Sequence, residues 1–177
     1  PSETLTAPGI YNDTLIASNQ FRCNDTAISQ VKIYEKPIAS GIISPLSGCV
    51  PLNVNFKNTS QNNLTGKWYF GNGDSSLQDS IDYTYITVGG YTPSLVIYGN
   101  ANCTDTFRLA STIDVYPNPV ADFDYEVINV STIFTNYSIG ANSYLWNFGD
   151  GVSSTQENLT HEFPESGSFV TTLIARN

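Results

Sequence analysis

Histidine, serine and threonine side chains are where a catalytic site of this sequence would begin. His161 is the single histidine of the 177 residues, and a hydroxyl nucleophile needs such a base within hydrogen-bond reach. The chain contains no Gly-x-Ser-x-Gly, His-Glu-x-x-His or Gly-Lys-Ser/Thr motif and no dinucleotide-binding glycine fingerprint. The sequence therefore predicts no catalytic residue, no cofactor site and a protein that is not an enzyme.

Three carboxylates at alternate positions are the candidate for a metal site. Asp122, Asp124 and Glu126 are close enough in sequence to offer the oxygen ligands that calcium prefers. Alternation also places all three on one solvent-facing side of a β-strand. The spacing does not match an EF-hand loop, so the calcium site and the solvated strand face both stay open as interpretations.

The charge and composition of the chain limit its partners and its class. Seven Lys and Arg against 16 Asp and Glu give a net charge of -9, which disfavours nucleic acid and anionic lipid as partners. No apolar run reaches the roughly 18 residues of a membrane span, and no signal peptide is recognisable. We expect an internal or mature piece of an exported chain, rich in Tyr, Phe, Thr and Ser and therefore in β-structure.

The sequence repeats itself at a shift of 78 residues. This shift aligns Trp68 with Trp146, and also Phe56/Phe134, Phe70/Phe148, Gly71/Gly149, Gly73/Gly151, Tyr85/Phe163, Gly89/Gly167, Tyr91/Phe169 and Leu95/Leu173. A shift of 80 aligns the N-terminal residues Gly9, Tyr11, Leu15 and Cys23 with Gly89, Tyr91, Leu95 and Cys103. We therefore expect three units: residues 1–36 as the C-terminal part of a repeat, 37–117 as a complete repeat, and 118–177 as a repeat truncated before its last strand.

Local patterns predict that each unit is a β-sandwich. Trp68 and Phe70 are two residues apart, so on a strand both side chains point to one face, the core. The glycines that follow suit a tight turn, and the β-branched run at 169–175 indicates a well-buried strand. The residues expected to specify core and turn are Trp68, Phe70, Gly71, Gly73, Trp146, Phe148, Gly149, Asp150 and Gly151.

The motif Trp-x-Phe-Gly-Asp-Gly at 146–151, followed by His161-x-Phe163 and Gly167-x-Phe169, resembles the polycystic kidney disease (PKD) repeat. The other copy departs from the family motif, with Asn72 in place of Asp and Tyr83 in place of His. The resemblance implies tandem immunoglobulin-like, seven-stranded β-sandwiches arranged as an extended array. It also implies a structural role for His161 and an extracellular or cell-surface location.

Two kinds of covalent modification follow from these patterns. Cys49 and Cys103 lie in the complete repeat, in regions that can meet at one end of a sandwich, so we expect a disulfide there and an oxidising compartment. Cys23 aligns with Cys103, and its partner is expected upstream of the segment. Thr14, Thr26 and Ser80 stand in Asp-Ser/Thr-apolar sequences that resemble an O-glycosylation acceptor of Bacteroidota, and the alternative interpretation is that these Asp-Ser/Thr pairs are turn residues. Eight Asn-x-Ser/Thr sequons occur, at Asn12, Asn24, Asn58, Asn63, Asn102, Asn129, Asn136 and Asn158.

The function expected from these features is a non-catalytic stalk. Proline-containing connectors at 35–37 and 116–119 favour extended chain and a semi-rigid array of units. Arrays of this kind resemble segments of large Bacteroidota cell-surface adhesins, gliding-motility filaments or type IX secreted proteins. Expected partners are neighbouring repeats, other surface proteins, glycans or like chains in a fibre. The alternatives are an accessory PKD module of a secreted polysaccharidase or protease, or an archaeal surface-layer protein.

Overall fold

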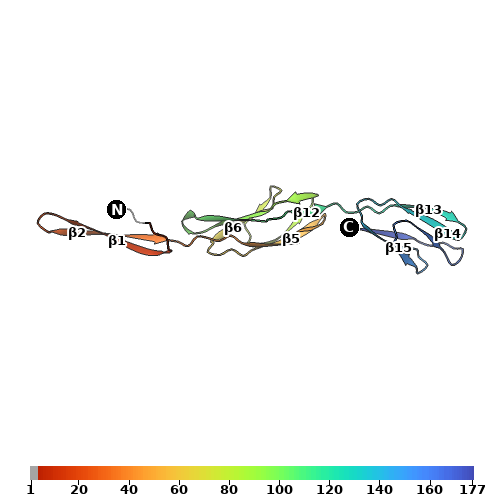
Figure 1. Ribbon diagram of the computed structural model, residues 1–177, viewed down its shortest axis with the longest axis horizontal. Helices are drawn as coiled ribbons and strands as arrows, with labels where there is room; N and C mark the ends of the chain where they lie inside the picture. Colours follow the sequence, from red (N-terminus) through yellow and green to blue (C-terminus); the bar gives the residue numbers. More distant parts are fainter. Residues whose placement is uncertain (1–3) are drawn as a thin grey trace.

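The structure, a computed structural model, describes residues 4–177 and is built almost entirely from β-strands. The strands fall into three parts that follow one another along the long axis of the molecule (Figure 1). We call these parts the N-terminal hairpin (9–33), the middle unit (41–116) and the C-terminal unit (123–176). The predicted all-β class with sandwich-type sheets is confirmed. Within residues 4–177, no helix has the length and apolar character to cross a membrane.

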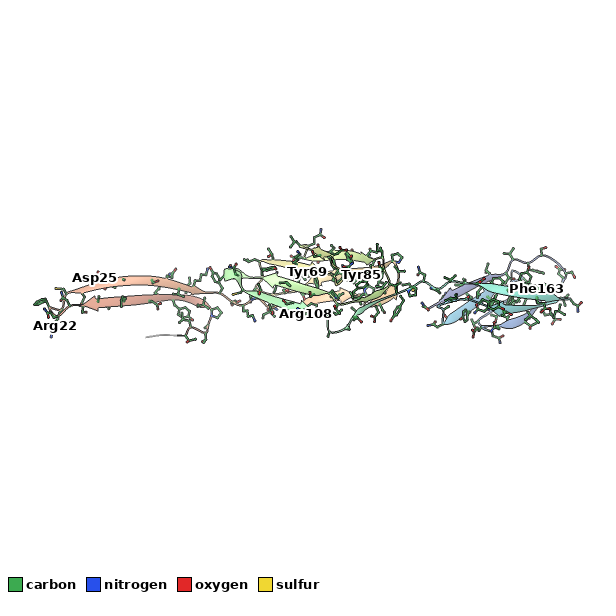
Figure 2. All side chains as sticks on the ribbon, turned by 90° about the horizontal axis from the view of Figure 1, so that it is seen from above. Arg22, Asp25, Tyr69, Tyr85, Arg108 and Phe163 are labelled. Atoms are coloured by element: carbon green, nitrogen blue, oxygen red, sulfur yellow. The ribbon has the colours of Figure 1, made fainter. Side chains whose placement is uncertain are left out.

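The N-terminal hairpin consists of β1 (Gly9–Ser18) and β2 (Asn24–Ile33), paired antiparallel along their whole length. Asn19 closes the turn, because its Oδ1 accepts the backbone N–H groups of Phe21 and Cys23. Arg22 and Asp25 mark the free end of this hairpin in Figure 2. Leu15 and Ile28 are 69% and 73% exposed, since within the described residues no second sheet packs on the hairpin.

The middle unit is a sandwich with its core between facing sheets. Its strands are β3 (Gly41–Ser44), β4 (Ser47–Cys49), β5 (Leu52–Asn58), β6 (Thr65–Tyr69), β7 (Ser75–Ser76), β8 (Ser80–Tyr85), β9 (Gly89–Tyr91), β10 (Ser94–Tyr98), β11 (Thr104–Arg108) and β12 (Ile113–Tyr116), with the 3-10 turn η1 (Asn100–Asn102). They form the sheets β3-β5-β8, β11-β10-β6-β7 and β4-β12-β9. Alternate residues of β5 and β6 are buried, so Val54 and Phe56 pack with Trp68 and with Leu95 of β10.

The C-terminal unit has fewer strands and a smaller core. Its strands are β13 (Phe123–Ile128), β14 (Ser131–Asn136), β15 (Ser143–Asn147), β16 (Ser153–Ser154), β17 (Leu159–Glu162) and β18 (Thr172–Arg176). They form two sheets, β13-β14-β17 and β16-β15-β18. Phe134, Trp146 and Phe148 are the buried centre, and partly buried Phe123 and Phe163 pack against them.

The first strand of a unit takes two different courses. In the middle unit, β3 pairs with β5 as far as Ser44. The chain then crosses to the other sheet as β4, which runs parallel to β12. In the C-terminal unit β13 stays paired with β14 from Phe123↔Asn136 to Ile128↔Ser131. Pro45, between β3 and β4, cannot donate to a ladder and interrupts the first course, whereas 123–136 contains no proline. The described part of the C-terminal unit also holds no counterpart of β12 for β13 to join.

The strand expected at 169–175 begins later than predicted and is less buried. β18 starts at Thr172, its residues alternate between exposed and half-buried, and Val170 is 80% exposed. Its counterpart β10 lies between β6 and β11, whereas β18 has β15 as its one neighbour among the described strands. The expectation of a well-buried strand was wrong because burial depended on this second neighbour.

Candidate functional site

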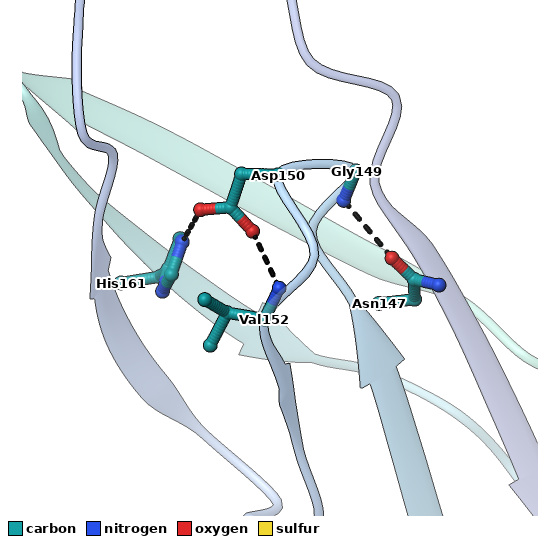
Figure 3. A network of polar contacts seen from close by, with 5 residues as sticks. All are labelled: Asn147, Gly149, Asp150, Val152 and His161. Carbon is teal, nitrogen blue, oxygen red and sulfur yellow. Dashed lines mark hydrogen bonds and ion pairs between the residues drawn. The ribbon is translucent and has the colours of Figure 1, made fainter.

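The turn after β15 holds the most organised polar contacts of the C-terminal unit (Figure 3). Asp150 accepts the backbone N–H of Val152 at 2.9 Å through Oδ1, and its Oδ2 lies 2.6 Å from Nε2 of His161. Asn147 Oδ1 accepts the N–H of Gly149 at 3.0 Å. The two short polar side chains therefore fix the path of the turn and attach it to β17.

The His161 ring is held by packing as well as by Asp150. It stacks on Phe148 with ring centroids 4.0 Å apart and contacts the ring of Phe163 edge-on at 4.6 Å. The side chains of His161 and Asp150 are 10% and 2% exposed. Among residues 4–177, Asp150 is the one side chain with a hydrogen bond to this ring, so the pair lacks the hydroxyl or thiol nucleophile that triad chemistry requires.

The middle unit has a similar turn, but its carboxylate, Asp74, stands two positions after Asn72, the residue that aligns with Asp150. Asn72 Oδ1 accepts the N–H of Asp74, and the Asn72 amide donates to the Tyr83 hydroxyl at 2.6 Å. That hydroxyl donates to Asp74, and the Tyr83 ring stacks on Phe70 with centroids 4.0 Å apart. Burial, together with Asp74, raises the pKa of Tyr83. The sequence comparison noted Asn72 and Tyr83 but missed Asp74, whose signal was a carboxylate standing where the other copy has Val152.

We expect the stability of the C-terminal unit to fall in acid through Asp150. Burial alone would raise the pKa of this carboxyl, but the hydrogen bonds from Val152 and His161 outweigh burial and lower the pKa. A lowered native pKa stabilises the fold above the ordinary value of about 4 and loses that contribution as pH falls through the native pKa. Urea unfolding of the C-terminal unit between pH 6 and pH 3 measures the loss.

Two variants make this pH prediction specific. Asp150→Asn, which installs the residue that the middle unit carries at this position, should flatten the profile below about pH 4. Asp124→Asn removes an exposed carboxylate of β13 and should retain the wild-type profile. A wild-type slope in Asp150→Asn would contradict the assignment.

The tryptophans and glycines of the motif lie in the core and the turns. Trp68 and Trp146 are both fully buried, so neither presents a ring face to a ligand. Trp146 Nε1 donates to the carbonyl of Gln156 at 2.8 Å, which ties β15 to the segment before β17. The four motif glycines all have positive φ, which glycine adopts without strain: Gly71, Gly73, Gly149 and Gly151.

The carboxylates considered for calcium are not assembled into a site. Asp122 precedes β13, while Asp124 and Glu126 are exposed on it. Asp124 Oδ1 accepts the N–H of Tyr125 at 2.8 Å, a local contact within the strand. Among the described residues, no three acidic, histidine or cysteine side chains are grouped to hold a metal ion. The geometry therefore favours the solvated strand face over the calcium site.

The expected disulfide between Cys49 and Cys103 is not formed, and both thiols are free. Cys49 lies opposite Tyr116 at the end of β12, beside the connector to the C-terminal unit. Cys103 follows η1, and its carbonyl accepts the N–H of Gly99, a residue packed against Pro37. The two cysteines thus lie at opposite ends of the sandwich, because the chain from Pro37 crosses its whole length before Cys49. The prediction assumed that these regions meet at one end.

The proposed modification sites are accessible in the structure. Thr14 and Thr26 lie on the exposed hairpin, and Ser80 is exposed at the start of β8. Cys23 is exposed at the free end of the same hairpin, and its pairing upstream of the segment stays a prediction. Four sequon asparagines already form hydrogen bonds through their side chains. Asn58 donates to Asp79, and Asn12, Asn136 and Asn158 accept hydrogen bonds from Gln30, Ser138 and Asn136. O-glycosylation at the three Ser/Thr positions remains a prediction.

Comparison with known proteins finds a family model that matches one part of the chain. A family model described as the PKD domain matches residues 117–177. A collagenase, ColA of Bacillus cereus, is 49% identical over 35 residues, which is 20% of this chain and 4% of the collagenase. The match thus spans a small fraction of that relative's length.

Solved structures of similar fold include two bacterial domains. The PKD1 domain of Vibrio anguillarum Epp is 24% identical, with a TM-score of 0.40 over 48% of this chain and 100% of the domain. The PKD1 domain of the Vibrio cholerae metalloprotease PrtV is 24% identical, with a TM-score of 0.39 over 45% of this chain and 99% of the domain. The family match falls on the segment that carries the Trp146–Gly151 motif, so residues 117–177 are similar to PKD domains.

Proposed function

We propose that this chain is a non-catalytic spacer segment of a larger extracellular or cell-surface repeat protein. In this role its units project or link other modules, as in an adhesive stalk. The observation that carries the proposal is the end-to-end order of the three parts along one axis (Figure 1). A spacer needs length per residue and restricted bending at its joints, and both depend on the connectors.

The connector before the middle unit is fixed to that unit. Pro37 is fully buried, and the N–H of Ile38 donates to the carbonyl of Gln61 at 3.0 Å. Asp105 accepts the N–H of Ala39 at 2.9 Å, and this hydrogen bond holds the pKa of Asp105 below its ordinary value. The chain therefore enters the middle unit along one path rather than as a free hinge.

The connector after the middle unit is short and is attached to that unit. Between Tyr116, the end of β12, and Val120, which bridges to Ile139, lie the residues Pro-Asn-Pro. Asn118 donates to the carbonyl of Val50 at 2.7 Å, so the connector is attached to the unit that it leaves. Two prolines with fixed φ and one such hydrogen bond leave little freedom at this joint.

Small-angle X-ray scattering tests the spacer. A compact chain of this length would have a radius of gyration of about 16 Å. We expect about twice that value, because the three parts extend along one axis. Replacing Pro117 and Pro119 by glycine should lower the mean radius by freeing the second joint, whereas Pro164→Gly, away from both joints, should leave it unchanged. A wild-type radius near 16 Å would rule the spacer out.

The relatives favour a second candidate, an accessory module of a secreted protease. Collagenase ColA carries the matched segment, and a metalloprotease carries one of the similar domains. In that role the chain would contact substrate rather than set a distance. Co-sedimentation with collagen fibrils distinguishes the two, because saturable binding supports the accessory module and its absence, together with an extended particle, supports the spacer.

The wider setting is proposed on the same basis. A location outside the cell fits the short match to a collagenase, because collagen is an extracellular protein. The disulfide no longer supports an oxidising compartment, since the cysteines are free. Exposure of Thr14, Thr26 and Ser80 is compatible with a glycosylated surface filament, including adhesins used in gliding or exported by the type IX system. Mass spectrometry of these three residues in native material tests the glycoprotein assignment.

A further inference from the structure

The outer face of the sheet β11-β10-β6-β7, on the middle unit, combines aromatic and basic side chains. Residues that alternate with the core positions of β6, β10 and β11 point to this face. They form rows across the sheet, since Ser94 lies between Tyr69 and Arg108, and Val96 lies beside Lys67 in the next row. Tyr69 and Arg108 are labelled in Figure 2. The Lys67 amino group lies 5.1 Å from the centre of the Tyr69 ring, so the ring and both cations occupy adjacent rows.

A second tyrosine lies at the other end of this face. Tyr98 stands between Thr65 of β6 and Thr104 of β11, in the row beyond Lys67. This row is four residues along β10 from the row of Tyr69, or about 14 Å at the usual rise of a strand. Tyr69 and Tyr98 are 38% and 41% exposed. The face is therefore a strip with an accessible ring near each end and a lysine between the rings.

No carboxylate of strands β6, β7, β10 and β11 points to this face. Asp105 is the one acidic residue on these strands, and it points to the other side, where it accepts the N–H of Ala39. The whole chain has 16 Asp and Glu against seven Lys and Arg, so a strip with two cations and no carboxylate of its own is set apart from the rest of the surface. Charges more than about 8 Å away are largely screened at physiological salt. A ligand on the strip therefore meets Lys67 and Arg108 rather than the net charge of the chain.

The outer face of the opposite sheet has a different character. There the outward polar side chains of β5 and β8 bond to each other, as Asn55 does when it donates to Asp82 at 3.0 Å. Within residues 4–177, the side chains of Lys67, Tyr69 and Arg108 form no hydrogen bond or ion pair with another side chain. The polar groups of one face are thus used within the protein, whereas those of the strip are available to a ligand.

The fold does not depend on the residues of the strip. The C-terminal unit has Asn147 where the middle unit has Tyr69, and Leu145 where it has Lys67. The Asn147 side chain turns back to its own loop and accepts the N–H of Gly149. A sandwich with the same central strands therefore forms without this ring and this cation, which leaves them free to serve binding in the middle unit.

We propose that the strip defined by Lys67, Tyr69, Tyr98 and Arg108 binds an acidic polysaccharide, a chain that contains uronic-acid residues. Ammonium and guanidinium groups pair with the carboxylates of such a chain, and a guanidinium does so through two parallel hydrogen bonds. Each tyrosine ring offers a flat apolar surface with a hydroxyl at its edge, on which a sugar ring packs. The hydroxyls of the neighbouring threonines supply further donors and acceptors for sugar hydroxyls.

An acidic protein surface is the competing ligand, and the strip matches it less well. The centre of a protein interface is depleted in charge and rich in apolar contact. The central row of the strip consists instead of Lys67, Val96 and Thr106, with one apolar side chain among three. Polysaccharide binding goes beyond the spacer proposed above, because it requires the middle unit to be folded but not the three parts to be extended.

Isothermal titration calorimetry of the 177-residue chain with polygalacturonate tests the proposal. We expect saturable binding that weakens as salt is raised, because surface charges are screened, and no binding of dextran, which is neutral. Polyglutamate is the third probe, and weaker binding of polyglutamate than of polygalacturonate supports a polysaccharide site. The proposal is overturned if polygalacturonate does not bind saturably or if dextran binds equally well. Polyglutamate binding at least as tight as polygalacturonate would also overturn it and assign the strip to an acidic protein.

Matched variants locate the bound polysaccharide. The double variant Lys67→Gln, Arg108→Gln should bind about tenfold more weakly, whereas Lys57→Gln, which removes an exposed lysine of the opposite sheet, should bind nearly as the wild type does. Tyr69→Ala should weaken binding about fivefold through the lost ring. Tyr137→Ala changes a tyrosine of the C-terminal unit that is 58% exposed, and should leave binding unchanged.

Unchanged melting temperatures verify that these exposed variants are folded. If Lys57→Gln weakens binding as much as one cation of the strip does, binding follows the overall charge and the proposed location is wrong. Wild-type affinity in the double variant would overturn the location as well. The scattering measurement remains separate, since a compact particle that still binds through Lys67 and Arg108 would remove the spacer and retain the polysaccharide site.

Discussion

Replacing Trp68 by alanine is expected to lower the free energy of unfolding of the middle unit by about 3–5 kcal/mol, because a large buried ring is lost and a cavity remains. The indole is fully buried and contacts Phe56 edge-on at 5.3 Å. A Cβ added at Gly41 would lie 2.6 Å from the indole Cη2, so the ring fills the space up to the backbone of β3. Little room exists for the site to collapse.

Chemical denaturation followed by near-UV circular dichroism measures this loss, with two controls. Tyr69→Ala changes the next residue of β6, which is 38% exposed, and should cost less than about 1 kcal/mol. Trp68→Phe should recover most of the stability, since the Trp68 Nε1 has no hydrogen-bond partner among the described residues and its loss leaves nothing unpaired. Equal destabilisation by the Trp68 and Tyr69 alanine variants would show that Trp68 is not a centre of the core.

Replacing Gly149 by alanine is expected to cost about 2–4 kcal/mol, the second large effect, through strain and steric overlap together. Gly149 has φ +83°, a conformation that side chains disfavour. A Cβ at this position would also lie 2.7 Å from the carbonyl oxygen of Val170 and 3.0 Å from its nitrogen. Backbone atoms cannot rotate away as a flexible side chain can, so the turn or the segment before β18 must move.

Gly151 supplies the matched control two residues later. Its φ is +93°, yet nothing lies within 4 Å of the position where its Cβ would be, so Gly151→Ala carries the conformational cost alone, about 1 kcal/mol. Thermal unfolding of both variants measures the difference. Equal melting temperatures would mean that the contact with Val170 does not limit the turn. The middle unit repeats the comparison with Gly71, whose Cβ would lie 2.8 Å from the nitrogen of Thr92, and Gly73.

Local spacing was sufficient for the features that a strand or turn determines by itself. Trp68 and Phe70 alternate with Tyr69, and the structure buries the first two and exposes the third. The glycines after Phe148 mark the tight turn, because only positive φ lets the chain reverse there. The shift of 78 also brought corresponding rings to corresponding places, as the stacked pairs Tyr85–Tyr91 and Phe163–Phe169 show.

Contacts between distant segments decided the rest. The same sequence type forms one continuous hairpin at the N-terminus, where Gly9 faces Ile33, but two separate strand pairs in the middle unit, where Gly89 faces Val115 and Leu95 faces Phe107. The middle unit has an opposite sheet on which the strands divide, and the hairpin has none among the described residues. Tyr and Leu stand at corresponding positions in both segments, so their spacing carries no signal for this division, whereas Pro93 stands between the two strands of the middle unit where the hairpin has Asp13.

The sequence by itself determined the all-β class and which aromatic residues face inward, since both depend on a period of two residues or on a glycine in a turn. Tertiary structure alone decided where the cysteines lie and which His or Tyr side chain each turn carboxylate contacts. Cys49 and Cys103 lie at opposite ends of the sandwich because β3 and β4 run along its whole length. Asp150 meets His161, and Asp74 meets Tyr83, because β17 and β8 bring each ring beside the turn. The local spacing of residues does not predict positions that depend on the pairing of strands far apart in the sequence.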